Sequence, residues 1–256
     1  AHDAIPLLCG VFEGAVDPQR DTKVSLFAPW ENGGYVVVDV PEAIWSHLGL
    51  TYLAHKHLPT IWDNSGQPLE PVEWSRRADG FLAMTRTLPN GLAFGARVLP
   101  GIRHAEFRWW VRNGTGAPLR QLTAQACVML GRASGFTHAA AGRRILEAPF
   151  AAASDESGRR WVITAWDGLN RVWQNPPVPC IHSDPRLTDC PPGETREARG
   201  WVWFHEGDDP RPELDRLRRE FLARPIPEVS TRQPIPDKLV VLTFDDSVAS
   251  LHGNVR

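Results

Sequence analysis

Hydrophobic and polar residues alternate along most of this chain, so that every second side chain is apolar. In segment 104–116, for example, Phe107, Trp109 and Val111 share one face and polar residues occupy the other. This period is typical of β-strands with one buried face. Segments with such a pattern are 22–28, 34–40, 81–98, 104–116, 119–130, 159–167 and 195–207.

Turn-forming residues separate these segments, and they indicate how consecutive strands connect. Asn90-Gly91 lies in the middle of 81–98 and predicts a β-hairpin, because both residues accept the positive φ that a tight turn needs. Short strands joined by turns, with few long connections, are typical of antiparallel sandwiches. We therefore predict a mainly β fold, a large antiparallel β-sandwich.

Helical signals are few. Segment 211–225 places Leu214, Leu217, Phe221 and Leu222 on one stripe and ends at Pro225, which predicts one C-terminal helix. Segment 41–48 could form two helical turns, with Pro41 at the first position.

Composition excludes some partners. The 256 residues carry a net charge of −2, so there is no basic excess to neutralise nucleic-acid phosphates. No apolar run approaches the roughly 20 residues that cross a bilayer, so we expect no membrane partner. The opening AHDAIP fits a processed secreted or periplasmic protein, or a trimmed sequence. The 11 tryptophans include possible platforms for sugar rings.

The C-terminal segment has a different character. Residues 225–237 form a proline-rich extended linker, and KLVVLTFDDS follows at 238–247. This stretch resembles the first motif of polysaccharide deacetylases. The resemblance implies that Asp245 is a catalytic base and Asp246 a metal ligand. The histidine motifs that would complete the metal site do not follow, so we expect 238–256 to be the truncated start of a deacetylase-like domain.

The body, residues 1–224, resembles the galactose-mutarotase-type supersandwiches of carbohydrate-active proteins. This resemblance implies a carbohydrate-recognising domain of a polysaccharide-processing protein, with a poly- or oligosaccharide as partner. The alternative is a glycoside hydrolase or polysaccharide lyase in its own right, using histidine and carboxylate groups as acid and base.

Segment 52–66 contains the first group of candidate catalytic residues. His55 and His57 would share one face of a strand, close to Asp63, and Trp62 could stack on a sugar. Paired imidazoles can bind a metal or exchange protons near neutral pH. If the chain is an enzyme, these groups would act in acid–base catalysis, and in either case we expect no metal and no cofactor. The alternative is a solvent-facing strand with two ordinary histidines.

Segment 173–194 contains the second group, on what its prolines suggest is a long ordered loop. His182 and Asp184 are catalytic candidates, and Trp173 and Asn175 are substrate-binding candidates. Cys180 and Cys190 could form a disulfide that braces the loop, or remain free thiols. The alternative is a purely structural loop. Arg143 could bind a sugar carboxylate.

The predicted strand at 195–207 is apolar on both faces around Trp201 and Trp203. Trp201 and Trp203 share a strand face, while Val202 and Phe204 share the other. One of these faces must be exposed to solvent, where an indole could bind a sugar, or lie under a loop or helix.

Overall fold

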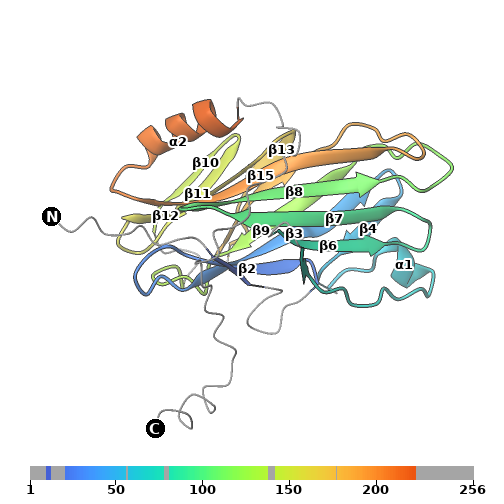
Figure 1. Ribbon diagram of the computed structural model, residues 1–256, viewed down its shortest axis with the longest axis horizontal. Helices are drawn as coiled ribbons and strands as arrows, with labels where there is room; N and C mark the ends of the chain where they lie inside the picture. Colours follow the sequence, from blue (N-terminus) through green and yellow to red (C-terminus); the bar gives the residue numbers. More distant parts are fainter. Residues whose placement is uncertain are drawn as a thin grey trace, which may run out of the picture. The chain divides into compact units, whose positions relative to one another are not determined.

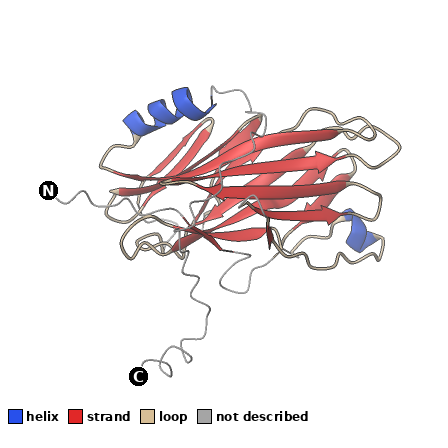
Figure 2. Cartoon of the chain, in the orientation of Figure 1, coloured by secondary structure: helices blue, strands red, loops and turns tan. Residues whose placement is uncertain are grey.

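Two antiparallel β-sheets make up most of the described chain (Figures 1 and 2). The computed structural model describes residues 10–12, 21–55, 57–77, 81–137, 142–176 and 178–222. Within these ranges the predicted mainly β, antiparallel sandwich is confirmed. The linker at 225–237 and the Asp245–Asp246 pair lie outside the described residues, so those predictions remain predictions.

The first sheet has seven strands, and it positions the site discussed below. β3 pairs with β4 in addition to its neighbours β2 and β9. In spatial order the main path runs β1 (Gly10–Phe12), β2 (Lys23–Phe27), β3 (Tyr35–Ser46), β9 (Thr123–Met129), β14 (Cys180–Pro185) and β13 (Leu169–Trp173), and β4 is Gly49–Leu53.

The second sheet has eight strands, and it contains the predicted hairpin. β6 and β7 pair Thr87 with Ala93, and Gly91 between them has φ of +86°, as the Asn-Gly turn requires. In spatial order the strands are β10 (Arg144–Glu147), β11 (Phe150–Ser154), β12 (Arg160–Trp166), β15 (Thr195–Glu206), β8 (His104–Arg112), β7 (Ala93–Pro100), β6 (Leu82–Thr87) and β5 (Ser75–Arg76).

Apolar side chains from both sheets form one central core, since alternate residues of each strand point inward. Val38 on β3, Val128 on β9 and Phe107 on β8 are members of this core and are almost fully buried. Burial of this kind contributes roughly 25 cal/mol for each Å² of apolar surface. The opposite face of the seven-stranded sheet is therefore free to carry polar side chains.

The predicted C-terminal helix is present as α2 (Arg211–Leu217), continued by a π-helical turn at Arg218–Leu222. Figure 1 shows α2 lying over β10 to β12. Leu214 and Leu217 pack with Trp201 and Trp203 in a second apolar cluster on the outer face of the eight-stranded sheet. The cover that these tryptophans require is thus a helix, and both indoles are buried.

The prediction of a helix at 41–48 is wrong. β3 continues through this segment to Ser46, because it pairs with β9 on one side and β4 on the other. Tertiary pairing of this kind overrides local helix preference. Between Asp39 and Ala43 the register against β9 shifts, so β3 has a bulge that contains Pro41. A bulge suits proline, which has no backbone N–H for the ladder.

Short helix α1 (Ile61–Asn64) occupies part of the segment expected to be a strand around His55. β4 ends at Leu53, and His55 and His57 lie in the turn that follows. Thr60 caps α1, and the Asp63 carboxylate accepts a hydrogen bond from the Thr60 backbone N–H at 2.9 Å. This capping box favours a helix start over continuation of the strand.

Candidate functional site

A group of buried polar side chains lies on the face of the seven-stranded sheet that points away from the central core. β14 contributes Cys180, His182 and Asp184, which alternate with the core residue Ile181. All three are at most 3% exposed. The segment around them was predicted to be a long loop, and that prediction is wrong because 180–185 pairs with both β9 and β13.

The bulge in β3 adds two carboxylates to this face. In a regular strand, residues 39 and 42 would point to opposite faces. Here His55 Nε2 lies 3.7 Å from Asp39 Oδ2 and 3.5 Å from Glu42 Oε1, so both carboxylates lie on the same side. Re-aiming a side chain is a common role of bulges near functional sites.

Asp39 is fully buried and neutralised by a cation. Lys23 on β2, which is its register partner, places Nζ 2.9 Å from Asp39 Oδ2. Thr22 donates a hydrogen bond of 2.6 Å to Asp39 Oδ1. Buried charges persist only when they are paired and hydrogen-bonded in this way.

Glu42 and His55 form the accessible edge of the group, with side chains 16% and 33% exposed. Burial, reinforced by the negative charge of Asp39, raises the pKa of Glu42 to about 7. Burial, reinforced by the positive charge of Lys23, lowers the pKa of His55. A carboxyl and a neutral imidazole therefore face each other near neutral pH, which suits proton exchange.

Asp184 is held rigidly by three donors. The backbone N–H of Ala126 donates to Oδ1 at 3.1 Å, and Oδ2 accepts from Arg171 Nε at 2.8 Å and from Trp173 Nε1 at 2.7 Å. Trp173 also stacks on the His182 ring, with centroids 3.9 Å apart and planes 17° from parallel. These contacts fix the orientation of the His182 imidazole.

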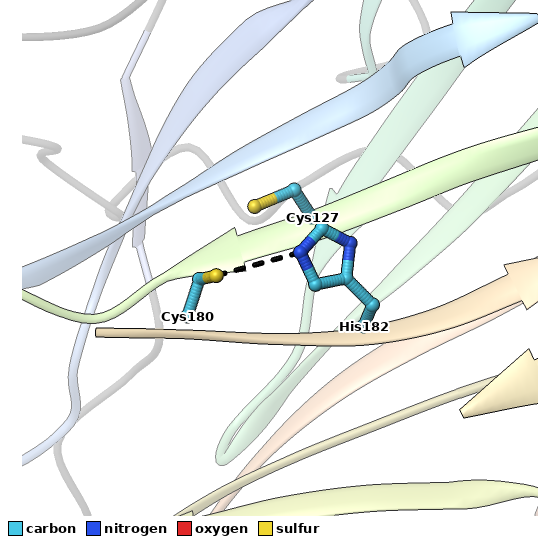
Figure 3. Close-up of side chains that lie close together, drawn as sticks. All are labelled: Cys127, Cys180 and His182. Carbon is cyan, nitrogen blue, oxygen red and sulfur yellow. Dashed lines mark hydrogen bonds between the residues drawn. The ribbon is translucent and has the colours of Figure 1, made fainter. Parts of the chain in front are cut away.

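Two cysteines complete the group. Figure 3 shows Cys127, Cys180 and His182 with their polar atoms turned toward one another. Cys180 Sγ lies 3.4 Å from His182 Nε2. A hydrogen bond from Cys127, with a further contribution from His182, lowers the pKa of Cys180, while the same bond raises the pKa of Cys127.

Cys190 does not pair with Cys180. Cys127, Cys180 and Cys190 are all free thiols in the structure. Cys190 instead donates a hydrogen bond to the Glu194 carbonyl at 3.2 Å. Of the two readings that the sequence left open, free thiols are the one present.

The structure brings together four of the residues predicted from the sequence: His55, His182, Asp184 and Trp173. His57 is exposed, with its ring 6.2 Å from that of His55. The backbone of Asn175 hydrogen-bonds to Cys180 and helps to lower the pKa of that thiol. His55 and His57 follow β4, and Asn175 follows β13, which ends at Trp173. His182 and Asp184 lie on β14.

The remaining predicted residues have structural contacts elsewhere. Trp62 is buried and donates a hydrogen bond to the Thr51 carbonyl at 2.8 Å, whereas Asp63 caps α1. Arg143 precedes β10 of the other sheet, where its guanidinium lies 4.8 Å from the Trp161 ring centroid. Nothing among these contacts links the three residues to the group on the seven-stranded sheet.

The sequence interpretation missed Lys23, Asp39, Glu42 and Cys127. Period-2 alternation assigns Asp39 and Glu42 to opposite faces, so it cannot show that they meet. Pro41 is the signal that could have found them, because a proline inside a strand pattern marks an edge or a bulge. Cys127 gave no local signal, since its proximity to His182 comes from the pairing of β9 with β14.

A pocket of about 520 Å³ lies elsewhere, lined by residues of β8, β15 and α2 that include His104, His205 and Glu213. Its charged residues already have partners: Arg216 donates a hydrogen bond of 2.8 Å to Glu213. We place the candidate site on the seven-stranded sheet instead, because buried polar groups converge there from four strands.

Comparisons with known proteins give structural neighbours only. No family model matches the chain, and no curated protein sequence matches it. A protein from the human microbiome, provisionally described as a kojibiose phosphorylase, aligns at 7% identity with a TM-score of 0.42. This chain spans 28% of that protein's length, and the alignment covers 84% of this chain.

Two further solved structures align with the chain. A protein from Klebsiella pneumoniae provisionally described as an aldose 1-epimerase has 10% identity and a TM-score of 0.38, over 69% of this chain and 63% of its own. The Slr1438 protein from Synechocystis has 10% identity and a TM-score of 0.43, over 79% and 96%. None of these neighbours is described as a deacetylase.

None of the described helices has the length and hydrophobicity to cross a lipid bilayer.

Proposed function

We propose that this β-sandwich is a carbohydrate-binding domain whose ligand site is the outer face of the seven-stranded sheet, at the edge formed by Glu42 and His55. The observation that carries the proposal is the convergence of the two β3 carboxylates, Asp39 and Glu42, with the His55 imidazole of the turn after β4 at a solvent-accessible edge. Sugar hydroxyls both donate and accept hydrogen bonds, so they fit a site with both kinds of partner.

Arg171 adds a cationic group beside this face. Its side chain is 50% exposed, although its Nε is bonded to Asp184. The remaining guanidinium donors can reach an acidic sugar, and a bidentate contact with a carboxylate would favour uronates. We therefore expect acidic oligosaccharides to bind more tightly than neutral ones.

The binding test is calorimetric titration of the chain with neutral and uronic oligosaccharides. Glu42→Gln and His55→Ala should each weaken binding about tenfold, equivalent to about 1.4 kcal/mol, since each removes or weakens a hydrogen bond to the sugar. Asp63→Asn is the matched control, because Asp63 caps α1 and should leave affinity unchanged. A folded chain that binds no oligosaccharide of the panel would contradict the proposal.

A second candidate is an acid–base enzyme, a glycoside hydrolase or polysaccharide lyase. The 3.5 Å separation of His55 Nε2 and Glu42 Oε1 favours it, since two proton-exchanging groups could act on one ligand. Turnover of aryl glycosides or polyuronides that Glu42→Gln abolishes would support the enzyme. Binding without turnover would support recognition alone.

The relation to polysaccharide deacetylases and the secreted or periplasmic location remain predictions from the sequence. Recovery of a longer gene that continues past residue 256 with histidine-containing motifs would support the deacetylase relation. A continuation without them would contradict it.

A further inference from the structure

Two thiols and an imidazole converge within the seven-stranded sheet in a way that neither carbohydrate recognition nor core packing requires. Cys127, Cys180 and His182 are each at most 3% exposed. Their ligand atoms all lie within 4.8 Å of one another. We propose that these three residues bind a Zn²⁺ ion. The sequence interpretation expected no metal, and this site became visible only when the strands were paired.

The ligand types favour zinc. Thiolate sulfur and imidazole nitrogen are the usual ligands of Zn²⁺ in proteins, whereas Mg²⁺ and Ca²⁺ prefer oxygen. Three protein ligands with a fourth position left for water or another group is a common arrangement of catalytic zinc sites.

The separation of the ligand atoms fits a tetrahedral ion. Zn–S and Zn–N bonds of about 2.3 and 2.0 Å at a tetrahedral angle place sulfur and nitrogen roughly 3.5 Å apart. Cys180 Sγ and His182 Nε2 are 3.4 Å apart in the structure. An ion could therefore bind between them with little movement of either side chain.

Strand pairing keeps the ligands in place. His182 lies directly opposite Cys127 in the β9–β14 ladder, and Cys180 precedes His182 by two residues on the same face. Both strands are interior members of the sheet. Ligands on paired strands are more rigid than ligands on loops, so little ordering is needed when the metal binds.

The surroundings of His182 supply what a zinc-bound imidazole needs. When Nε2 binds the metal, Nδ1 must carry the proton, and a neighbouring carboxylate usually accepts it. Nδ1 is buried without a hydrogen-bond partner among the described residues. It lies 3.8 Å from Glu42 Oε2 and 3.9 Å from Asp184 Oδ1. Asp184 already accepts three hydrogen bonds, so Glu42 is the acceptor that we expect to move closer.

The test is Co²⁺ binding to the full chain, reduced and then stripped of metal with a chelator. Co²⁺ replaces Zn²⁺ in tetrahedral sites and gives a thiolate-to-metal charge-transfer band. We expect one Co²⁺ for each chain, displacement of that Co²⁺ by Zn²⁺, and a higher Tm when Zn²⁺ is present. The measurement needs no sugar, so its result is independent of the function proposed above.

Substitutions of the three proposed ligands test whether the metal binds at this position. Cys127→Ser, Cys180→Ser and His182→Ala should each abolish the charge-transfer band. Cys190→Ser is the matched control, since it removes another buried thiol that bonds to Glu194 and should leave the band intact. Glu42→Gln should weaken Co²⁺ binding about 10- to 100-fold while keeping the band shape.

Two results would overturn the proposal. One is absence of the charge-transfer band in the folded, reduced wild-type chain. The other is a band that persists in Cys180→Ser. If the ligand variants fail to fold, the alkylation rates of the wild-type thiols decide: Zn²⁺ should slow alkylation of Cys127 and Cys180 and leave the rate at Cys190, which burial already limits, unchanged. A stable Cys127–Cys180 disulfide in a chain that binds no Co²⁺ after reduction would assign the pair a redox role instead.

Discussion

The buried pair of Lys23 and Asp39 is the clearest example of how single residues shape this protein. Both side chains are at most 3% exposed, and they lie opposite each other on β2 and β3. Removing water from two charges costs free energy, which the contact and the Thr22 hydrogen bond offset. Such a pair holds the Asp39 carboxylate in place beside His55.

Breaking the pair should destabilise the fold. Lys23→Met leaves the Asp39 carboxylate buried and uncompensated, so we expect the free energy of unfolding to fall by about 3–5 kcal/mol. Urea denaturation measures the change. Asp208→Asn is the control, because the Arg159–Asp208 pair is exposed and should contribute less than about 1 kcal/mol. Equal effects of the two substitutions would contradict this account.

A second test at this scale separates charge from packing. The double variant Lys23→Met/Asp39→Leu removes both charges, and it should recover much of the stability lost in Lys23→Met. Failure to recover would mean that the Asp39 carboxylate has further partners that the substitution breaks.

At the scale of elements, α2 and the ends of β8 and β15 form a pH-sensitive part of the sandwich. Burial lowers the pKa of both His104 and His205, while Glu106 and Glu213 oppose and Arg216 reinforces the change. Both imidazoles are therefore neutral in the folded chain at pH 7. The unfolded chain binds protons at these positions first as pH falls.

The stability contributed by His104 and His205 should decrease on mild acidification. The contribution of the two histidines is fully present above the unfolded pKa of about 6.5, and it is lost as pH falls from there toward their lower folded pKa values. Over the same range the raised pKa of Glu42 adds stability as pH falls, so the histidine contribution is measured as a difference. Between pH 7.5 and 5.5 the free energy of unfolding of the wild-type chain should fall relative to that of His104→Gln/His205→Gln. Glu213, whose pKa the Arg216 hydrogen bond lowers, loses its contribution only below pH 4.5. The same pH dependence of unfolding in the wild-type chain and the double variant would contradict this assignment.

Elements with strong alternation were predictable from the sequence, and elements defined by pairing were not. Phe107, Trp109 and Val111 identify β8 by themselves, and the apolar stripe of 211–222 identifies α2. β14 alternates too, but its outward residues are Cys180, His182 and Asp184 between prolines, which indicate a loop. Only its position between β9 and β13 makes it a strand.

At the scale of the whole molecule, the two sheets divide the roles. The space between them holds the apolar core, and the outer face of the seven-stranded sheet holds the polar group. The fold class followed from local pattern, because each strand records which of its faces is buried. The candidate site did not, since its members come from β2, β3, β9, β14 and the turn after β4, whose proximity arises only from strand order.

The packing of α2 against Trp201 and Trp203 sets a lower limit on recombinant fragments of this protein. The two indoles stack on each other 5.8 Å apart beneath Leu214 and Leu217. A fragment ending at Gly207 would expose this aromatic surface to water and should self-associate, which size-exclusion chromatography would detect as higher-order species. One ending at Leu222 should remain monodisperse under the same conditions. The helix thus keeps an aromatic surface of the eight-stranded sheet out of contact with water.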